Sequence, residues 1–186
     1  MKFLLALALA TATSFAVADC ELGKSPKSMS TAEIGEHYKN CVRDDLIVGY
    51  QAKKDPLALE YTSWKAVATG PAKPGMHGGR YLMTYVNDTG FAEYVKYNST
   101  DANMPIGTKI AKESYKLKKK GKVKAGPVFF MEKVGKEMMP KTDGWKYSAV
   151  KPSGKVMKVK QGFCHGCHKI YPTQDFLGYP VSDVRL

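Results

Sequence analysis

Runs of apolar, β-branched and aromatic residues separated by short polar breaks cover much of the chain, and they predict β-strands. The segment 80–86 is apolar on both faces, which is typical of a central strand with both faces covered. Alternating or apolar runs predict the remaining strands at 61–69, 108–117, 123–134 and 145–150. The glycine- and proline-rich segment 71–79 is expected to be a loop.

Helical signals occur before, between and after these strands. Ser30 and Glu33 fit a capping box, which predicts a helix that continues to Cys41. Asp88 is expected to cap a short helix over 88–95. Consecutive strands with helices at the ends predict one antiparallel β-sheet with peripheral helices, a mainly β or α+β fold.

The first 18 residues have the features of a secretory signal peptide. Lys2 precedes an apolar run, and Ala16-Val17-Ala18 fits a small-x-small cleavage site. The run is too short to span a membrane, and no later segment approaches the required length. We therefore predict a periplasmic protein with an N-terminal helical extension over 19–57 and a main domain over 58–186.

Length and charge exclude several classes of protein. The chain has 186 residues, of which 44% are hydrophobic and 25% charged, as expected for one globular domain. The net charge of +12 in an exported protein argues against nucleic acid and for acidic partners. Lysines alternate along one predicted hairpin, and they form either a solvated edge or a docking face for an acidic redox partner: Lys116, Lys118, Lys119, Lys120, Lys122 and Lys124.

The four cysteines are of two kinds. Cys20 and Cys41 stand alone, and an exported protein is expected to join them in a disulfide, although two free thiols are the alternative. Cys164 and Cys167 lie in a Cys-x-x-Cys-His run that ends at His168. Two thiols at this spacing can add to the two vinyl groups of one haem, and the adjoining histidine can then ligate the iron.

Other interpretations of this motif are weaker. A zinc site requires a second Cys or His pair at short spacing, which Cys20 and Cys41 do not supply. A thioredoxin-like redox pair requires a βαβ context, which is absent here. The sequence therefore predicts one covalently bound haem c, carried on a short C-terminal helix.

The position of the motif limits the second axial ligand. Only 18 residues follow His168 and none of them is methionine, unlike in ordinary electron-transfer cytochromes c. The 17 glycines and 10 prolines also argue against the long helices of four-helix cytochromes c′. We expect an iron with His168 as its one strong ligand and a sixth position that is open or weakly filled. The upstream methionines that remain as candidates are Met131, Met138, Met139 and Met157.

Several short motifs, in their shared order, resemble the cytochrome P-460 family over residues 58–186. They are Tyr61-Thr62-Ser63-Trp64, Thr69-Gly70, Tyr85-Val86-Asn87, Gly107–Glu113, Phe129-Phe130-Met131, Gly144-Trp145 and Cys164–His168. The resemblance implies a mostly antiparallel β fold, usually homodimeric, with five-coordinate haem and an exposed distal pocket.

The resemblance also implies two activities. Members named for the family carry a lysine linked to the porphyrin edge in a Gly-Thr-x-x-x-Lys-Glu context, which here is Lys112, and they oxidise hydroxylamine. Their relatives, the β-type cytochromes c′, lack the link and bind nitric oxide or carbon monoxide. Ile106 departs from the family, which often has Asp before Gly-Thr.

The residues alone leave the facing of Lys112 open. In a strand over 108–117, Lys112 shares a face with Ile110, which is expected to point toward the haem. Ala111 and Tyr115 make the opposite face apolar as well.

Hydroxylamine oxidation requires a base near the iron. Glu137, which follows the predicted strand at the place where related enzymes have a carboxylate, is the first candidate, and Glu132 is the second. Arg80 is expected to line the pocket or meet the haem propionates, since guanidinium pairs well with carboxylate. His77, beside a glycine pair, is a further pocket residue and a minor candidate for the sixth ligand.

Three hypotheses follow from these observations. The first is a hydroxylamine-oxidising enzyme that uses the Lys112 link and a distal base. The second is a protein that binds nitric oxide or carbon monoxide, and needs only open iron and apolar walls such as Phe129 and Phe130. Plain electron transfer is the third, and it needs a stable sixth ligand.

Overall fold

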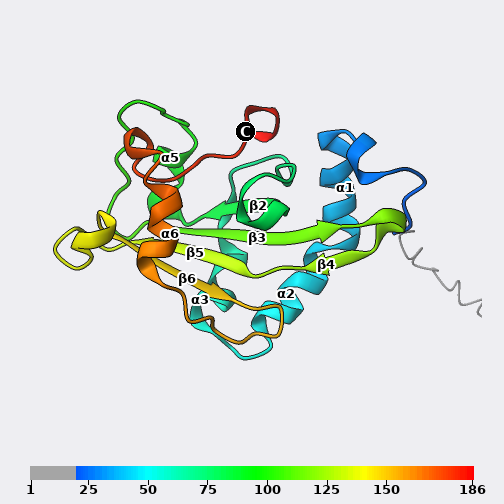
Figure 1. Cartoon of the computed structure of the whole chain (residues 1–186), viewed down its shortest axis with the longest axis horizontal. Helices are drawn as coiled ribbons and strands as arrows, with labels where there is room; N and C mark the ends of the chain where they lie inside the picture. The colour runs from blue at the N-terminus through cyan, green and yellow to red at the C-terminus, as the bar shows by residue number, and fades with distance from the viewer. Residues whose placement is uncertain (1–19) are drawn as a thin grey trace, which may run out of the picture.

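The computed structural model describes residues 20–186, so the predicted signal peptide lies outside the described part of the chain. The centre of the described part is a six-stranded sheet, and its strands are antiparallel as the sequence predicted (Figure 1). The strands pair in the order β1-β2-β3-β5-β6, and β4 pairs with the C-terminal end of β3. Their bounds are β1 (Lys65–Ala66), β2 (Tyr81–Val86), β3 (Lys109–Leu117), β4 (Val123–Ala125), β5 (Val128–Lys133) and β6 (Trp145–Val150).

Short helices surround this sheet. The α-helices are α1 (Thr31–Cys41), α2 (Arg43–Gln51), α3 (Pro56–Glu60), α4 (Met76–Gly79), α5 (Asp88–Tyr94) and α6 (Gln161–His168). The 3₁₀ turns are η1 (Pro26–Ser28), η2 (Tyr61–Ser63), η3 (Lys119–Gly121), η4 (Pro140–Thr142), η5 (Pro172–Gln174) and η6 (Ser182–Val184). Among the residues described, no helix combines the length and the apolar character that a membrane crossing requires.

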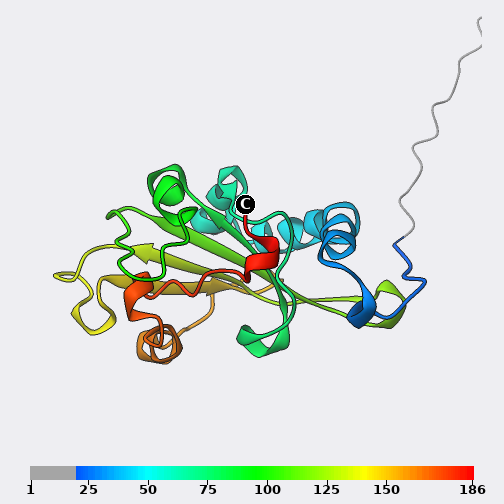
Figure 2. The same cartoon turned by 90° about the horizontal axis from the view of Figure 1, so that it is seen from above.

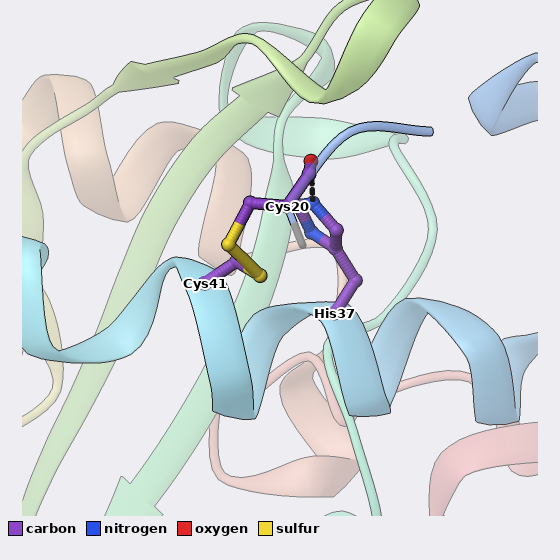
Figure 3. The surroundings of a disulfide bond; sticks show 3 residues. All are labelled: Cys20, His37 and Cys41. Atoms are coloured by element: carbon purple, nitrogen blue, oxygen red, sulfur yellow. Dashed lines mark hydrogen bonds between the residues drawn. A yellow bond between two sulfur atoms is a disulfide. The ribbon is translucent and has the colours of Figure 1, made fainter. Parts of the chain in front are cut away.

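The N-terminal extension begins as predicted. The Ser30 hydroxyl accepts a hydrogen bond from the Glu33 backbone N–H, and the Glu33 carboxylate accepts one from the Ser30 N–H, so the capping box is complete. Helix α1 then runs to Cys41. The predicted disulfide joins Cys41 to Cys20 with a Cα–Cα distance of 5.6 Å, and His37 Nε2 lies 3.3 Å from the Cys20 carbonyl oxygen (Figure 3).

The first predicted strand is largely wrong. Only Lys65–Ala66 pair with β2, and Tyr61–Ser63 instead continue the preceding helix as the turn η2. The Thr62 and Ser63 hydroxyls donate to the carbonyl oxygens of Leu59 and Glu60, at 3.1 and 2.8 Å. These local bonds satisfy the end of α3 and favour the turn over a strand.

Two other boundaries differ from the prediction. The segment 123–134 is split into β4 and β5 at Gly126-Pro127, because proline has no N–H to donate to a ladder. The cap of α5 is Asn87 rather than Asp88. Its Oδ1 accepts hydrogen bonds from the N–H groups of Gly90 and Lys109. One side chain therefore caps the helix and also binds the first residue of β3.

Different parts of the chain cover the two faces of the sheet. Helices α1 and α2 lie on one side and α6 on the other (Figure 2). Because side chains alternate along β3, Ala111 and Tyr115 pack with the N-terminal helices, whereas Ile110 packs on the α6 side. Lys112 shares the α6 side with Ile110, since both line the same cavity there, and this settles the facing that the sequence left open.

Candidate functional site

A cavity of about 790 Å³ lies between the sheet, α6, α4 and the C-terminal tail. Its volume is within the range of cofactor and ligand sites, and its walls are mainly apolar. Strands β3 and β5 contribute Lys112, Phe129 and Met131, and α6 contributes both cysteines of the motif and His168. The motif and Lys112 are 52 or more positions apart in the chain, and the fold brings them to one cavity.

Helix α6 presents the motif to this cavity, as expected. Cys164 and Cys167 carry free thiols, the first half-buried and the second exposed. Residues three apart on a helix share one side, so both thiols face the same volume. Burial raises the pKa of the Cys164 thiol.

His168 is oriented by a single strong contact. Its Nδ1 lies 2.6 Å from the Phe176 carbonyl oxygen. A carbonyl only accepts, so Nδ1 must carry the proton and Nε2 is left with a free lone pair. Burial, and after it the charge of Lys112, lower the pKa of His168 to about 4, which keeps the imidazole neutral as a metal ligand requires.

The turn that supplies this carbonyl is itself held by a buried ion pair, which the sequence analysis missed. Asp175 and Phe176 both have positive φ, at 49° and 64°. The Asp175 carboxylate accepts from Lys133 Nζ at 2.7 Å, from Trp145 Nε1 at 3.3 Å and from the Met104 N–H at 2.9 Å. The ion pair thereby fixes the strained turn beside His168.

His165, which lies inside the motif, anchors α6 to the sheet. Its Nδ1 is 3.1 Å from the Tyr147 hydroxyl, and its Nε2 is 3.3 Å from Asp143 Oδ2. Tyr147 belongs to β6 and Asp143 to the turn after η4. The middle of the motif is therefore structural, while its two ends face the cavity.

Lys112 is buried in the cavity with only 7% of its surface exposed. Its Nζ donates to the carbonyl oxygens of Leu177 and Gly178, at 3.2 and 3.0 Å. Burial lowers the pKa of Lys112 to about 8, because desolvation disfavours the charged amine. A fraction of the Lys112 amine is therefore neutral near neutral pH.

Arg80 and His77 also line the cavity, as the sequence suggested. Arg80 Nη1 donates to the His77 carbonyl oxygen at 2.8 Å, so the guanidinium holds the α4 turn. The His77 ring packs edge-on against Phe129 at a centroid distance of 4.6 Å. Phe130, by contrast, packs on the other face against Tyr61 and counts as core.

The two candidate bases are not brought into the cavity. Glu137 is exposed on the turn after β5, and Glu132 Oε1 lies 3.0 Å from Lys146 Nζ. Within residues 20–186, the cavity lining includes no carboxylate. Of the methionines considered as ligands, Met131 and Met157 line the cavity, whereas Met138 and Met139 do not.

A comparison with protein families identifies the domain. The family described as cytochrome P-460 matches residues 58–177, which include all the strands and the whole motif. The chain belongs to the cytochrome P-460 family. No curated protein matches the chain significantly. The match begins after α1 and α2, so the N-terminal extension over 19–57 lies outside it.

Membership of this family implies a haem, and the cavity fits one. It offers two free thiols three positions apart, an imidazole whose Nδ1 is already engaged, and mainly apolar walls. Arg80, which lines the cavity, is suited to a propionate.

Proposed function

We propose that the protein is a periplasmic mono-haem c-type cytochrome. Cys164 and Cys167 would form thioethers with the porphyrin, and His168 would ligate the iron through Nε2. The proposal is supported by the motif, by the family, and by the engaged Nδ1 of His168. When bound, the haem supplies an iron that takes up small ligands and electrons.

We further propose that this cytochrome oxidises hydroxylamine to nitrogen oxides, with Lys112 linked to the porphyrin edge. The observation that carries this proposal is the Lys112 amine, buried inside the cavity and held by two carbonyl oxygens. A lysine placed there without a carboxylate partner is costly unless it serves the site. The lowered pKa makes a larger fraction of the amine available as a nucleophile.

Formation of the bond between Lys112 and the porphyrin is an oxidation by two electrons. Joining Nζ to a porphyrin carbon replaces one N–H and one C–H bond by one C–N bond, so two protons and two electrons are removed. A two-electron oxidant such as a peroxide must accept them. The linked product is therefore two hydrogens lighter than lysine and haem together.

A second function is favoured by one observation. Among the described residues that line the cavity there is no carboxylate to take protons from hydroxylamine. A protein that binds nitric oxide or carbon monoxide requires no such base. We keep this as the alternative function of the same site.

We also propose that the lysine-rich hairpin, residues 116–124, docks an acidic redox partner. The six lysines are exposed along the end of β3, the turn η3 and β4. Such a positive surface raises the rate of association with a negative partner and loses this effect at high salt.

Mass spectrometry of the trypsin-digested holoprotein separates the two functions. We expect Lys112 to resist cleavage and to be joined to the haem peptide, at a mass two hydrogens below the sum of the parts. Lys112→Arg is expected to lose both the link and hydroxylamine turnover with a dye acceptor. Lys109→Arg is the matched control, because Lys109 pairs with Glu60 outside the cavity.

An unmodified Lys112 in active holoprotein would contradict the link. An unmodified Lys112 together with no hydroxylamine turnover would favour the alternative, binding of nitric oxide or carbon monoxide.

A further inference from the structure

A buried lysine lies at the centre of the contacts that hold the motif of helix α6. The side chains of Lys133 and Asp175 are only 10% and 9% exposed, and their charged groups meet at 2.7 Å. Lys133 Nζ also donates to the Asp143 carbonyl oxygen at 3.2 Å, and it lies over the Trp145 ring, 5.0 Å from the centroid. Neither Lys133 nor Asp175 lines the cavity, so neither side chain is placed to touch a bound haem.

Two short routes lead from this lysine to the motif. Asp175 precedes Phe176, whose carbonyl oxygen lies 2.6 Å from Nδ1 of His168. Asp143 meets the other histidine with its carboxylate, since its Oδ2 is 3.3 Å from Nε2 of His165. One buried amine is therefore connected to both histidines of the motif, through Asp175 to the first and through Asp143 to the second.

The backbone on both routes has an uncommon conformation. The angle φ is 52° at Asp143, 49° at Asp175 and 64° at Phe176, although none of the three is glycine. This left-handed conformation is unfavourable for residues with a Cβ atom, and it persists only where the surroundings impose it. Lys133 acts on both turns, because it binds the Asp143 carbonyl oxygen in one and the Asp175 carboxylate in the other.

The ion pair is better explained by orientation than by stability. The cost of removing two charges from water offsets much of their attraction, and apolar side chains of similar volume often stabilise a core equally well. An ion pair differs from an apolar contact because it requires particular atoms to meet. The Asp175 carboxylate meets three N–H donors, which come from Lys133, Trp145 and Met104. The carbonyl group of the next residue is thereby held in one place.

We propose that Lys133 and Asp175 are positioning residues that set the strength of the bond from His168 to the haem iron. A carbonyl oxygen held firmly on Nδ1 raises the basicity of the imidazole, and partners of this kind tune a metal ligand. A more basic ligand favours ferric iron and lowers the reduction potential. The inference rests on the haem of the proposed function, and it requires neither the Lys112 link nor hydroxylamine.

The test uses the full chain matured with its haem. Resonance Raman spectra of the ferrous protein, as isolated or after photolysis of bound carbon monoxide, report the frequency of the stretch between iron and His168. We expect Lys133→Met to lower this frequency. It should also raise the reduction potential by at least about 59 mV, which is a tenfold change in the equilibrium of a one-electron couple.

A second variant guards against a folding failure. Lys133→Met leaves the Asp175 carboxylate buried without its cation, which is strongly unfavourable. Asp175→Asn removes that charge and keeps one acceptor oxygen. It is expected to shift the frequency and the potential in the same directions by smaller amounts.

Two controls separate positioning from folding. Lys146→Met breaks the ion pair of an exposed lysine with Glu132, and should change neither the frequency nor the potential. Glu113 is buried against the Tyr38 and Tyr61 hydroxyls and does not line the cavity, so Glu113→Ala should lower stability and leave the frequency unchanged. Thioether-bound haem is measured in every variant.

A wild-type frequency and potential in a haem-bearing Lys133→Met or Asp175→Asn variant would overturn the positioning role, while the cytochrome proposal would stand. An equal fall of the frequency in Glu113→Ala would also overturn it, because any loss of stability would then suffice. So would a potential that shifts without the frequency, since altered access of solvent explains that result. A wild-type protein without thioether-bound haem would overturn both proposals.

Discussion

Lys112 and Glu113 are neighbours on β3, both are buried, and they face opposite sides of the sheet. Glu113 is fully buried against the N-terminal helices, and its carboxylate accepts from the Tyr61 hydroxyl at 2.8 Å and from the Tyr38 hydroxyl. The Tyr85 hydroxyl completes this network by contact with Tyr38 at 2.7 Å. Among the described residues, the Lys112 amine donates only to backbone carbonyls, and the side chain lines an open cavity.

Burial moves both groups toward their neutral forms. It raises the pKa of Glu113 to about 7 and lowers the pKa of Lys112 to about 8. The surroundings differ, because hydroxyl donors fill the space around the carboxylate, whereas space remains beside the amine. We infer that the Glu113 side holds the fold together and that the Lys112 side is kept for a cofactor.

The N-terminal extension contributes to the hydrogen-bond network around Glu113. Tyr38 comes from α1, and Arg43 at the start of α2 donates to the Tyr85 hydroxyl at 3.2 Å. Ile34, Leu46 and Tyr50 of the same helices are buried. Although α1 and α2 lie outside the family match, they pack on the face of the sheet that carries Glu113, and the disulfide joins Cys20 to the last residue of α1.

The largest expected effect is on the Glu113 side. Glu113→Ala leaves two buried tyrosine hydroxyls without their acceptor, and it should lower the free energy of unfolding by about 3 kcal/mol or more. Compared with protein in which Lys112 is not linked to the haem, Lys112→Met should change it by less than about 1 kcal/mol, because no charged partner is lost and an apolar chain suits the cavity. Urea denaturation of the two holoprotein variants measures both. Equal losses would remove the distinction between the faces.

The fold was more predictable than the site. β6 was predicted at its observed bounds, and β2 and β3 within one residue. The pattern of apolar residues along a strand reflects which of its side chains are buried. The facing of Lys112 could not be predicted, since helices cover both faces of the sheet and both are therefore apolar.

Within the site, Cys164–His168 could be recognised because chemistry fixes the spacing of the motif, and Arg80 and His77 line the cavity as suggested. The pair formed by Lys133 and Asp175 joins segments 42 positions apart, and no local pattern records such a contact. Glu137 was chosen because related enzymes have a carboxylate after the corresponding strand, but in this structure that strand ends beyond the cavity. His77 had one usable signal, the glycine pair that follows it.

The pH dependence of stability distinguishes Glu113 from Lys112. Because the pKa of Glu113 is raised from 4.5 to about 7, the folded state binds this proton more tightly than the unfolded state does. Its contribution is complete below pH 4.5 and is lost as the pH rises toward 7, by up to about 3 kcal/mol.

Glu113→Gln should remove this slope, and the difference in unfolding free energy between this variant and wild type at pH 4.5, 6 and 8 measures it. While Lys112 is not linked to the haem, its lowered pKa has the opposite effect at higher pH, and stability rises between about pH 8 and 10.5. A difference between the Glu113→Gln variant and wild type that does not change from pH 4.5 to 8 would contradict the assignment.

The smallest effect on stability is expected at the lysine-rich hairpin. Reversing the charge of Lys118, Lys120 and Lys122 to Glu should change the unfolding free energy by no more than about 0.5 kcal/mol per site, because all three are exposed. Oxidation of the ferrous protein by anionic hexacyanoferrate(III) should become slower, and oxidation by a cationic cobalt(III) complex faster. Rates that do not respond to the sign of the oxidant would exclude steering by this surface.

The central claim is that the cavity between β3 and α6 holds one haem, bound through Cys164 and Cys167. The mass of the peptide that contains α6, taken from the exported and matured protein after acid extraction of free haem, tests this most directly. We predict a peptide that is heavier by one haem and has no thiol left to alkylate. Two free thiols that react with an alkylating reagent, in a folded protein without bound pigment, would contradict it.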